Sequence, residues 1–593
     1  MIPGEPVSGP ETSVPTGTQS FALLAKRRVA FFALVVAIVT VLVGWLAAIL
    51  EANGFGILDA LLVAAFLIQV PTIAIAFANA LIGFILVRWT PTPLALVSPP
   101  MARADDSGRI SLRTAVAMTM RNEDPARSLK HLETVMASLE RTGFGECFDC
   151  HVLSDSDDAA AIAAEVRFID AWRARAPYGN RLFYRRRDRN IGFKGGNVHD
   201  FCEHHSRDYD LAVMLDTDSL MAGTTILRMV RIMQANPWLG ILQTFAVGLP
   251  SGSLFARIFQ FGHRHGMRCF VFGAAWWQGE CCQFWGHNCA IRVAPFAESC
   301  KLPILSGGPP LGGHIICHDQ IEAALMRRAG YEVRFLPEET GSWEGNPPTL
   351  PDFIKRNGRW CLGNLQNLRL LFLPGLRLVS RFHLAYMAQK FFGGAMVPIF
   401  ATLAAVAAAT WPDGRVFPAH AALALYLTWL VVYFSPRIFG VLDALLRARS
   451  HYGGTAQLVT GGIVEILFNF LLLPVAMFAA AHCMIALIFA RTVTWEGQRR
   501  DGYRLSWTSA GKAFWQPTVF GAALLGILYV AVPGAIPWFV PFLMGLILAI
   551  PFAVFSSMPA IGAVAARWKL CGIPEEITGA PEINAVMPLL SPR

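Results

Sequence analysis

The sequence predicts an α/β domain inserted into a bundle of membrane-spanning helices, and three observations support this fold class. The chain has 593 residues, more than the roughly 250–300 at which one hydrophobic core stops growing, so at least two structural units are expected. A mean hydropathy of +0.45 and a hydrophobic content of 54% are typical of membrane proteins. Charged residues make up only 15% and gather in the middle of the chain, where a soluble domain is therefore expected.

The N-terminal region is predicted to enter the membrane and return. Residues 1–25 are rich in Pro, Ser, Thr and Gly and have little to bury, so they are expected to be disordered. Two transmembrane helices are expected within residues 26–90, at Val29–Leu50 and Ile57–Val87. Basic residues precede the first helix and Arg88 follows the second, whereas the loop between them has none. By the positive-inside rule, both outer ends lie in the cytoplasm.

Residues 91–349 have the composition of a cytoplasmic α/β domain. Short apolar runs alternate with amphipathic stretches, and a polar loop follows each run. This recurrence predicts a parallel sheet whose functional loops lie along one edge. The expected strands are Thr114–Met120, Phe148–Leu153, Arg181–Arg187 and Asp210–Asp216.

The C-terminal part is predicted to return to the membrane. Residues 350–375 form an amphipathic helix with Lys and Arg between apolar residues at helical spacing, which favours a position on the membrane surface. Residues 376–565 form a C-terminal transmembrane region, and residues 566–593 form a cytoplasmic tail. The expected spans of this region are Arg381–Thr410, His420–Leu446, Phe514–Val532 and Ile536–Ala560.

One further apolar run, Val459–Ala490, has basic residues on both sides and Pro474 near its middle. The positive-inside rule places both of its ends in the cytoplasm, which a single crossing would not allow. We therefore expect a re-entrant or interfacial pair of helices broken at Pro474, or two short spans. In either case the number of crossings is even.

The net charge of +9 does not indicate a nucleic-acid partner. Lys and Arg gather at the ends of apolar runs and in the loop Arg185–Arg189, where few aromatic residues accompany them. A solvated loop that faces anionic lipid or a nucleotide is favoured there. Ten of the 12 cysteines lie between Cys147 and Cys361, in the segment that the charge pattern places in the cytoplasm, so free thiols are expected. Cys147 to Cys150 and His314 to His318 have no matching second pair at zinc-finger spacing.

The strongest local motif is Asp216-Thr-Asp218, which follows a buried apolar strand. Ligands of open α/β sheets bind at the carboxyl ends of the strands. Two carboxylates this close favour a divalent cation, Mg²⁺ or Mn²⁺, shared with a substrate diphosphate. The alternative is an Asx turn that caps the helix beginning near Thr224.

Three other polar residues follow strands of the same predicted sheet. Glu123, Asp155 and Lys194 would give a pocket with an acidic floor and one cation for phosphate, which suits a nucleotide that carries a sugar on its diphosphate. Gly195 and Gly196 would let the backbone approach that diphosphate closely. The alternative is that loop ends are simply polar.

Asp319 and the pair Arg359-Trp360 complete the set of candidates. Asp319 begins an amphipathic helix, either as a capping residue or as a general base that accepts the proton of an incoming hydroxyl. Arg359 could neutralise a leaving diphosphate. Trp360 could stack on a sugar ring or anchor the helix at the membrane interface.

These motifs, in this order, resemble those of the processive family 2 glycosyltransferases of the cellulose synthase type. That family has Asp, Asp-x-Asp, Thr-Glu-Asp and Gln-x-x-Arg-Trp, and this chain departs at two of them: Cys317-His318-Asp319 replaces Thr-Glu-Asp, and Arg356 replaces Gln. Within the group, the chain more closely resembles the glucans biosynthesis glucosyltransferase H family over about residues 25–570. The strings that carry this resemblance are Phe284 to Phe296, His318-Asp319 with Glu322 to Gly330, Arg359 to Asn364, and Trp495 with Gln498 to Gly502.

The resemblance implies a GT-A-like domain, UDP-glucose as donor, a β-1,2-linked glucan of the osmoregulated periplasmic type as product, and export across the bacterial inner membrane. The implied partners are membrane lipids, the growing glucan, acyl carrier protein and periplasmic glucan-processing proteins. The implied roles are catalytic for Asp319; donor-binding for Glu123, Asp155, Lys194, Asp216 and Arg359; acceptor-binding for Trp360, Trp285 and His287; and metal-binding for Asp216 and Asp218.

The loop 491–507 resembles the gating loop of cellulose synthase, with Trp495, Arg499 and Arg500 as the residues expected to cover the donor. The alternative is a basic loop whose Trp495 anchors at the interface. Two rival functions are a non-processive transferase onto a membrane lipid carrier and a non-catalytic transporter or nucleotide sensor. Only the last would bind a UDP-sugar without releasing UDP.

Overall fold

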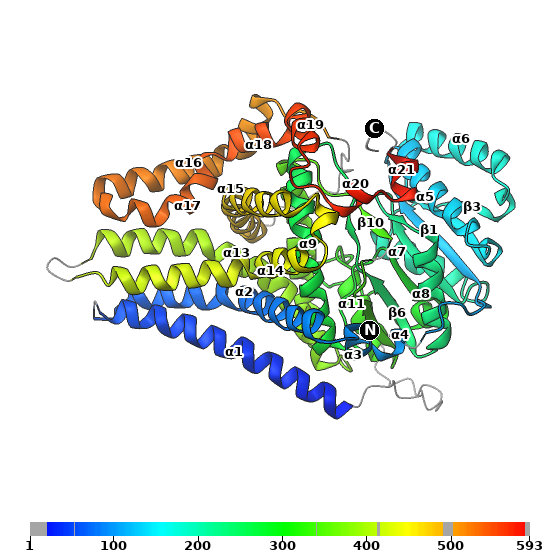
Figure 1. Ribbon diagram of the computed structural model, residues 1–593, viewed down its shortest axis with the longest axis horizontal. Helices are drawn as coiled ribbons and strands as arrows, with labels where there is room; N and C mark the ends of the chain where they lie inside the picture. Colours follow the sequence, from blue (N-terminus) through cyan, green and yellow to red (C-terminus); the bar gives the residue numbers. More distant parts are fainter. Residues whose placement is uncertain are drawn as a thin grey trace.

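The structure, a computed structural model, describes residues 21–52, 54–102, 104–339, 341–411, 416–489 and 502–587. It has two parts that lie side by side (Figure 1). Strands and their covering helices form an α/β domain, and long apolar helices extend from it as a bundle. The predicted fold class, an α/β domain within a helical membrane bundle, is confirmed.

The main sheet has seven strands in the order β3-β2-β1-β4-β8-β6-β9. We expected a parallel sheet, and this is wrong for β8, which runs antiparallel to β4 and to β6. The long helix α9 (Leu254–Gln278) lies between β6 and β8 and returns the chain to the end of the sheet at which β6 stops, because Gln243 pairs with Cys289; β8 therefore runs back beside β6. The strands are β1 (Thr114–Met120), β2 (Phe148–Ser154), β3 (Leu182–Arg186), β4 (Leu211–Asp216), β6 (Leu239–Thr244), β8 (Cys289–Arg292) and β9 (Glu332–Leu336).

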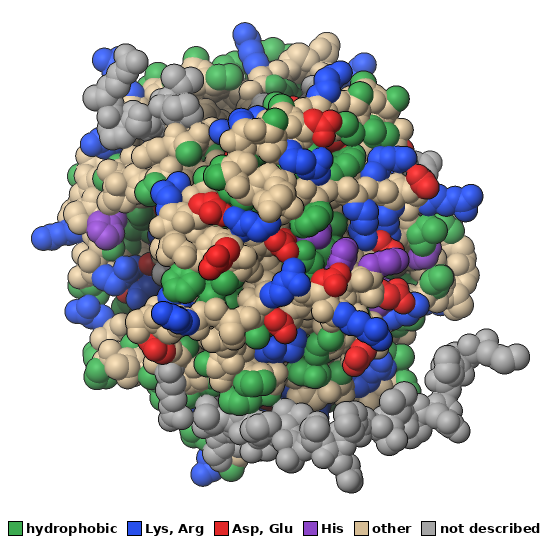
Figure 2. Space-filling view, turned by 90° about the vertical axis from the view of Figure 1, so that its right-hand side faces the viewer, with side chains coloured by type: hydrophobic (Ala, Val, Ile, Leu, Met, Phe, Trp, Pro, Cys, Tyr) green, Lys and Arg blue, Asp and Glu red, His purple; other side chains and the backbone are tan. Residues whose placement is uncertain are grey.

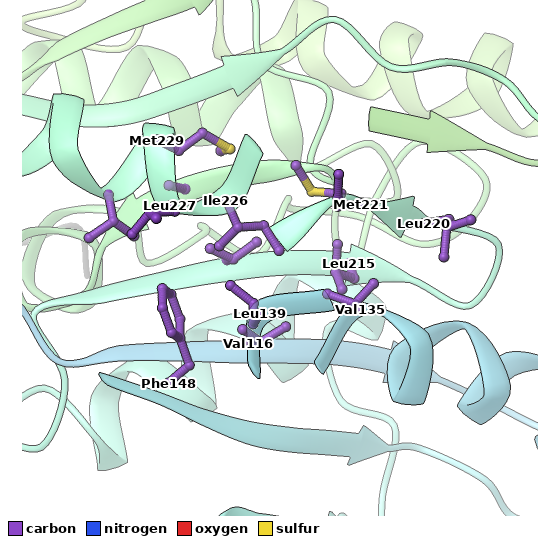
Figure 3. Packing of buried hydrophobic residues seen from close by; sticks show 14 of the residues in the cluster. Val116, Val135, Leu139, Phe148, Leu215, Leu220, Met221, Ile226, Leu227 and Met229 are labelled. Carbon is purple, nitrogen blue, oxygen red and sulfur yellow. The ribbon is translucent and has the colours of Figure 1, made fainter. Parts of the chain in front are cut away.

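The core of the domain lies on both faces of β1 and β4, whose apolar runs are fully buried. On one face, Val116 and Leu215 pack in one cluster with Val135 of α5 (Pro125–Glu140) and Ile226 of α8 (Gly223–Ala235) (Figure 3). On the other face pack α7 (Phe193–His204), α10 (Val293–Ser299) and α11 (Asp319–Arg328). Each such side chain contributes about 1.5–3 kcal/mol by burial. The strands are therefore rigid supports for the loops at their ends.

The bundle contains six helices that are long and apolar enough to cross a membrane within the described residues. Helix α9 joins the two parts, because it packs closely against α2. A Cβ at Gly83 would lie 1.7 Å from the carbonyl oxygen of Cys269, and one at Gly273 would lie 1.9 Å from that of Asn79. The six helices are α1 (Phe21–Glu51), α2 (Ile57–Trp89), α13 (Leu378–Ala409), α14 (Ala419–Arg447), α15 (Thr455–Ile488) and α16 (Trp507–Ala531).

Helix α15 corrects the expected break at Pro474, because it is one continuous helix. Pro474 has no N–H to donate to Phe470, and α17 (Ile536–Ile547) packs Gly545 against the freed carbonyl: a Cβ there would lie 2.8 Å from it. Figure 1 shows α13 and α14 lengthwise and α15 foreshortened, so the axis of α15 is inclined to the axes of those two helices. Near one end Cys571 Sγ donates to the Gly461 carbonyl, and near the other Cys483 Sγ lies 3.9 Å from the carbonyl oxygen of Gly358.

The last predicted span, Ile536–Ala560, is also corrected. It consists of α17 and α18 (Ala549–Ser557), which are bent by 53° at the break between them. The predicted surface helix is α12 (Leu350–Asn367), followed by the short turn η3 (Leu368–Leu370).

The chain then returns to the α/β domain through three short helices, α19 (Pro559–Arg567), α20 (Pro574–Thr578) and α21 (Pro581–Val586). α21 lies against α5, where Ile583 joins the core and Glu582 accepts a hydrogen bond from Ser138 (2.6 Å). Figure 2 shows the end of the molecule away from the bundle, where charged side chains of both signs are interspersed.

Candidate active site

The site lies at the carboxyl ends of β1, β2 and β4. In the parallel register Met120 pairs with Ser154 and Thr119 pairs with Asp216, so the loops that follow these strands meet at one edge. Glu123 follows β1 and is partly exposed beside the first turn of α5. The sheet thus brings together the polar residues that the sequence placed after separate strands.

Lys194 and Asp216 form an ion pair at the centre of this edge. Lys194 lies in the first turn of α7, which follows Gly192 in the left-handed region (φ 71°). Burial disfavours the charged ammonium, but the carboxylate of Asp216 outweighs it and raises the pKa of Lys194. The pair therefore presents one cation and one anion where a diphosphate and its counter-ion would lie.

A second acidic group, Glu344, lies beside Asp218, and the sequence analysis missed it. Glu344 ends β10 (Ser342–Glu344), whose small sheet also contains β5 (Leu220–Met221) and β7 (Val247–Gly248). Its Oε2 is 3.2 Å from Nε2 of His287. Burial raises the pKa of Glu344, and the carboxylates of Asp218 and Asp216 add to the rise. The backbone after it approaches Asp218 closely, since a Cβ at Gly345 would lie 3.0 Å from that of Asp218.

The acidic residues fit a divalent cation only as a shared site. Within the described ranges, no group of three or more His, Cys, Asp or Glu side chains is arranged to hold a metal ion. Mg²⁺ commonly uses one or two carboxylates and takes its other oxygens from substrate phosphates and water. Asp216 and Asp218 can supply these carboxylates, and the mutual repulsion that raises the pKa of Glu344 would be relieved by a cation.

Asp155 makes a buried, bidentate ion pair with Arg187, at 2.7 Å to Nε and 2.8 Å to Nη2. Arg187 also donates to the carbonyls of Ile191 and Phe193, so it fixes the loop that leads to Lys194. The expected solvated basic loop is therefore wrong for Arg187, because Asp155 draws it inward. A donor-binding role for Asp155 stays a prediction.

Asp319 is the first residue of α11 and is partly exposed. The turn at Gly286, in the left-handed region (φ 75°), packs against it, and a Cβ there would lie 3.3 Å from that of Asp319. Burial raises the pKa of Asp319, and the neighbouring His318 partly opposes the rise. A carboxylate with a raised pKa binds a proton more strongly, as a general base must.

Helix α12 is fastened to the loop that carries Asp319. Asn367 Nδ2 donates to the carbonyl of Cys317 (3.0 Å), and Gln366 Oε1 accepts from the N–H of Ile316 (3.0 Å). Gly363 allows this approach, since a Cβ there would lie 2.4 Å from Cys317 Sγ. Arg359 lies one helical turn before Gly363 on α12 and is partly exposed.

The aromatic candidates are partly covered by protein. The Arg356 guanidinium lies 4.6 Å from the Trp360 ring centroid, so this cation stacks on the indole that we expected to contact a sugar. Trp360 is still 45% exposed. Trp285 packs edge-on against Phe335 at 4.9 Å, and His287 is engaged by Glu344. Acceptor-binding roles for Trp360, Trp285 and His287 stay predictions.

Comparison with known proteins identifies the family. Residues 211–555, more than half of the chain, match the model of "Glycosyl transferase family group 2". A glucans biosynthesis glucosyltransferase H from Xanthomonas campestris pv. campestris (strain B100) is 33% identical over 548 residues, which is 89% of this chain and 84% of that protein. The chain belongs to the glucans biosynthesis glucosyltransferase H family. It is thus a family 2 glycosyltransferase, a glucosyltransferase of glucan biosynthesis.

Other similarities were also found. The member of the glucosyltransferase H family from Shewanella oneidensis is 34% identical over 559 residues, or 90% of this chain and 75% of that protein. Among solved structures, a mannosyltransferase from Pyrobaculum calidifontis, in complex with GDP-Man and Mn²⁺, is similar with a TM-score of 0.42 and 16% identity over 66% of this chain and 99% of that one.

For this member of the glucosyltransferase H family, two sets of predictions differ in outcome. Glu123, Asp155, Lys194, Asp216, Asp218 and Asp319 come from five segments and lie at one edge of the domain, and their roles stay predictions. The gating residues Trp495, Arg499 and Arg500 lie outside the described residues. The missed residue, Glu344, ends a strand of only three residues, six residues before α12 begins, so no periodicity in the sequence marks it.

Proposed function

We propose that this glucosyltransferase polymerises glucose from UDP-glucose into a β-1,2-linked glucan of the osmoregulated periplasmic type, with inversion, and passes the product across the bacterial inner membrane. The observation that carries the proposal is that Asp319 lies close to the Lys194–Asp216 ion pair, because a Cβ at Gly195, next to Lys194, would lie 2.8 Å from the Cβ of His318, next to Asp319. A carboxylate that can accept a proton then lies near a cation that can bind a phosphate. The relatives' name and the implied donor of the resembling family supply the sugar.

In the proposed mechanism the chain's own residues bind, orient and deprotonate. Lys194 and the N–H groups of the first turn of α7 bind the diphosphate of the donor. A divalent cation bound by Asp216 and Asp218 would neutralise charge on the departing diphosphate. Asp319 accepts the proton of the acceptor hydroxyl as its oxygen attacks the anomeric carbon from the face opposite to UDP. The bond to UDP breaks as the new glycosidic bond forms, which inverts the anomeric centre.

The helical bundle lies where the growing glucan would leave the active site. α12 touches the loop of Asp319 on one side and, through Gly358, the end of α15 on the other. A glucan that leaves Asp319 along α12 would therefore meet the bundle. We place the α/β domain and both termini in the cytoplasm, in keeping with the distribution of Lys and Arg. Acyl carrier protein and periplasmic glucan-processing proteins are the proposed partners.

The test is the product that the purified enzyme makes from UDP-glucose, with Asp319→Asn as the variant. The amide keeps the size of the side chain and loses its basicity, so UDP binding is retained and turnover falls on the order of 10²–10⁴-fold. UDP release, UDP affinity and linkage analysis of the product check this. Wild-type turnover in the variant would remove Asp319 from its role, and a glucosylated lipid in place of a polymer would favour the lipid-carrier transferase.

A further inference from the structure

A buried ion pair lies directly behind the proposed base and has no place in the mechanism above. His318 precedes Asp319, and Glu322 lies one helical turn further along α11. His318 Nδ1 is 2.7 Å from Glu322 Oε2, and the two side chains are only 9% and 1% exposed. Burying two charges is costly unless they are well paired. The energetic cost of burying this pair therefore suggests that its charges have a role beside Asp319.

Backbone on two sides holds the imidazole of His318 in place. A Cβ at Gly195 would lie 2.8 Å from the Cβ of His318, so the first turn of α7 presses against it. A Cβ at Gly286 would lie 3.3 Å from His318 Cε1, on the ring's other flank. These two glycines adjoin Lys194 and His287. The ring is thus wedged between the segments that carry the donor-binding and acceptor-binding candidates.

The charge of the pair is set by Glu322. Burial alone would lower the pKa of His318, but the carboxylate of Glu322 outweighs this and raises it. Lys194 opposes the rise, and burial lowers the pKa of His199, which also faces Glu322 from α7. The thiols that face this region stay neutral, because burial raises their pKa; they are Cys202, Cys289, Cys300 and Cys317. The buried contact of 2.7 Å with Glu322 thus favours the imidazolium form of His318, next to Asp319.

We propose that His318, held as an imidazolium by Glu322, is a positioning residue that keeps Asp319 ionised and fixes the start of α11 for glucosyl transfer. This inference rests on the proposed function, in which Asp319 is the base. Two factors disfavour the charged form of Asp319: its burial and the carboxylate of Glu322. Among the groups that favour the charged form, His318 has the largest effect, larger than that of Lys194. In the cellulose synthase type of motif a Glu precedes the Asp, so this chain carries the opposite charge there.

The test is the pH profile of kcat/KM for His318→Gln. Asp319 must be a carboxylate to accept a proton, so activity is present above its pKa and lost as the pH falls through it. Removing the imidazolium raises that pKa and moves the acid limb upward by about one pH unit, since a nearby charge shifts a carboxyl pKa by about 1–3 units. At pH values well above the limb, kcat returns to within about threefold of the wild type if His318 acts through charge. An unmoved acid limb would overturn the inference.

Two further variants keep the inference testable. His318→Gln leaves Glu322 buried without its partner, which destabilises the fold, whereas His318→Gln with Glu322→Gln removes both charges and leaves two amides in contact. Its acid limb shifts upward by less than that of the single variant, because Glu322 no longer adds to the rise. His314→Gln is the control: this imidazole lies on the same loop, beside Phe193, and is not paired with Glu322. A shift in the control equal to that of His318→Gln would show that the effect is not specific.

The outcomes separate this inference from the proposed function. If Asp319→Asn keeps its turnover, the assignment of the base fails whatever His318 does. If Asp319→Asn is inactive while both His318 variants keep the wild-type acid limb and UDP affinity, the base stands and only the positioning role is wrong.

Discussion

Glu344 shows how one side chain can complete a site that spacing in the sequence does not reveal. It comes from β10, more than 120 residues after Asp218, and reaches that carboxylate through a small sheet in which Trp343 pairs with Leu220. Its contact with His287, 3.2 Å between Oε2 and Nε2, holds the side chain at the site. A negative charge beside Asp218 favours whatever cation the carboxylates share.

We expect Glu344→Gln to raise the Mg²⁺ or Mn²⁺ concentration needed for half-maximal activity by about tenfold, the lower end of the effect of groups that support metal ligands. The amide keeps the shape and removes the charge. Metal titrations of UDP release measure this, with the exposed Glu298→Gln of α10 as a control that leaves the titration unchanged. An unchanged metal requirement in Glu344→Gln would mean that this carboxylate serves the fold alone.

Among the elements, α12 is the one whose packing decides where Asp319 lies. Two of its glycines differ in surroundings. A Cβ at Gly363 would lie 2.4 Å from Cys317 Sγ, whereas a Cβ at Gly358 would have nothing within 4 Å. Alanine favours a helix over glycine by about 1 kcal/mol at either position. Any difference between the two variants in activity therefore reports the contact with the loop of Asp319.

Gly363→Ala is expected to lower kcat about 10- to 100-fold, because the added methyl group must push aside the segment that carries Asp319, and small displacements of reacting groups are costly. UDP affinity falls less than kcat, since Lys194 and Asp216 lie on other elements and only Arg359 of the donor-binding candidates lies on α12. Gly358→Ala keeps the wild-type rate. Steady-state kinetics measure kcat for both variants. Equal kcat values would show that the packing of α12 against the loop of Asp319 does not affect the reaction.

The elements also show what sequence reasoning can and cannot reach. Strands β1 and β4 were predicted closely because uninterrupted apolar runs such as Val213 to Leu215 end in charged residues, a local pattern. The direction of β8, the Asp155–Arg187 pair and the continuity of α15 depend on partners far along the chain. Pro474 predicts a break by local rules, and only the close approach of Gly545 explains why the helix continues. The polar ends of strands were thus predictable, and their mutual contacts were not.

For the whole molecule, activity is expected to depend directly on the cation shared between the carboxylates and the substrate. With only two predicted carboxylate ligands, the cation is held largely by the substrate and exchanges readily. We expect activity to vanish in EDTA and to return with Mg²⁺ or Mn²⁺, which UDP release measures directly. Rescue by Zn²⁺ alone would contradict an oxygen-ligand site and favour sulfur or imidazole ligands.

The C-terminal segment sets the order in which the protein can be completed. Arg257 of α9 is 2% exposed and pairs with Glu576 at 2.7 Å, while Glu582 and Ile583 close the surface of α5. These partners follow every long apolar helix in the chain, so a ribosome makes them only after those helices have emerged. Until then Arg257 lacks its carboxylate, and a buried unpaired guanidinium is strongly unfavourable. The nascent transferase domain therefore stays unfinished until membrane insertion is under way, which couples maturation of the enzyme to delivery into its membrane.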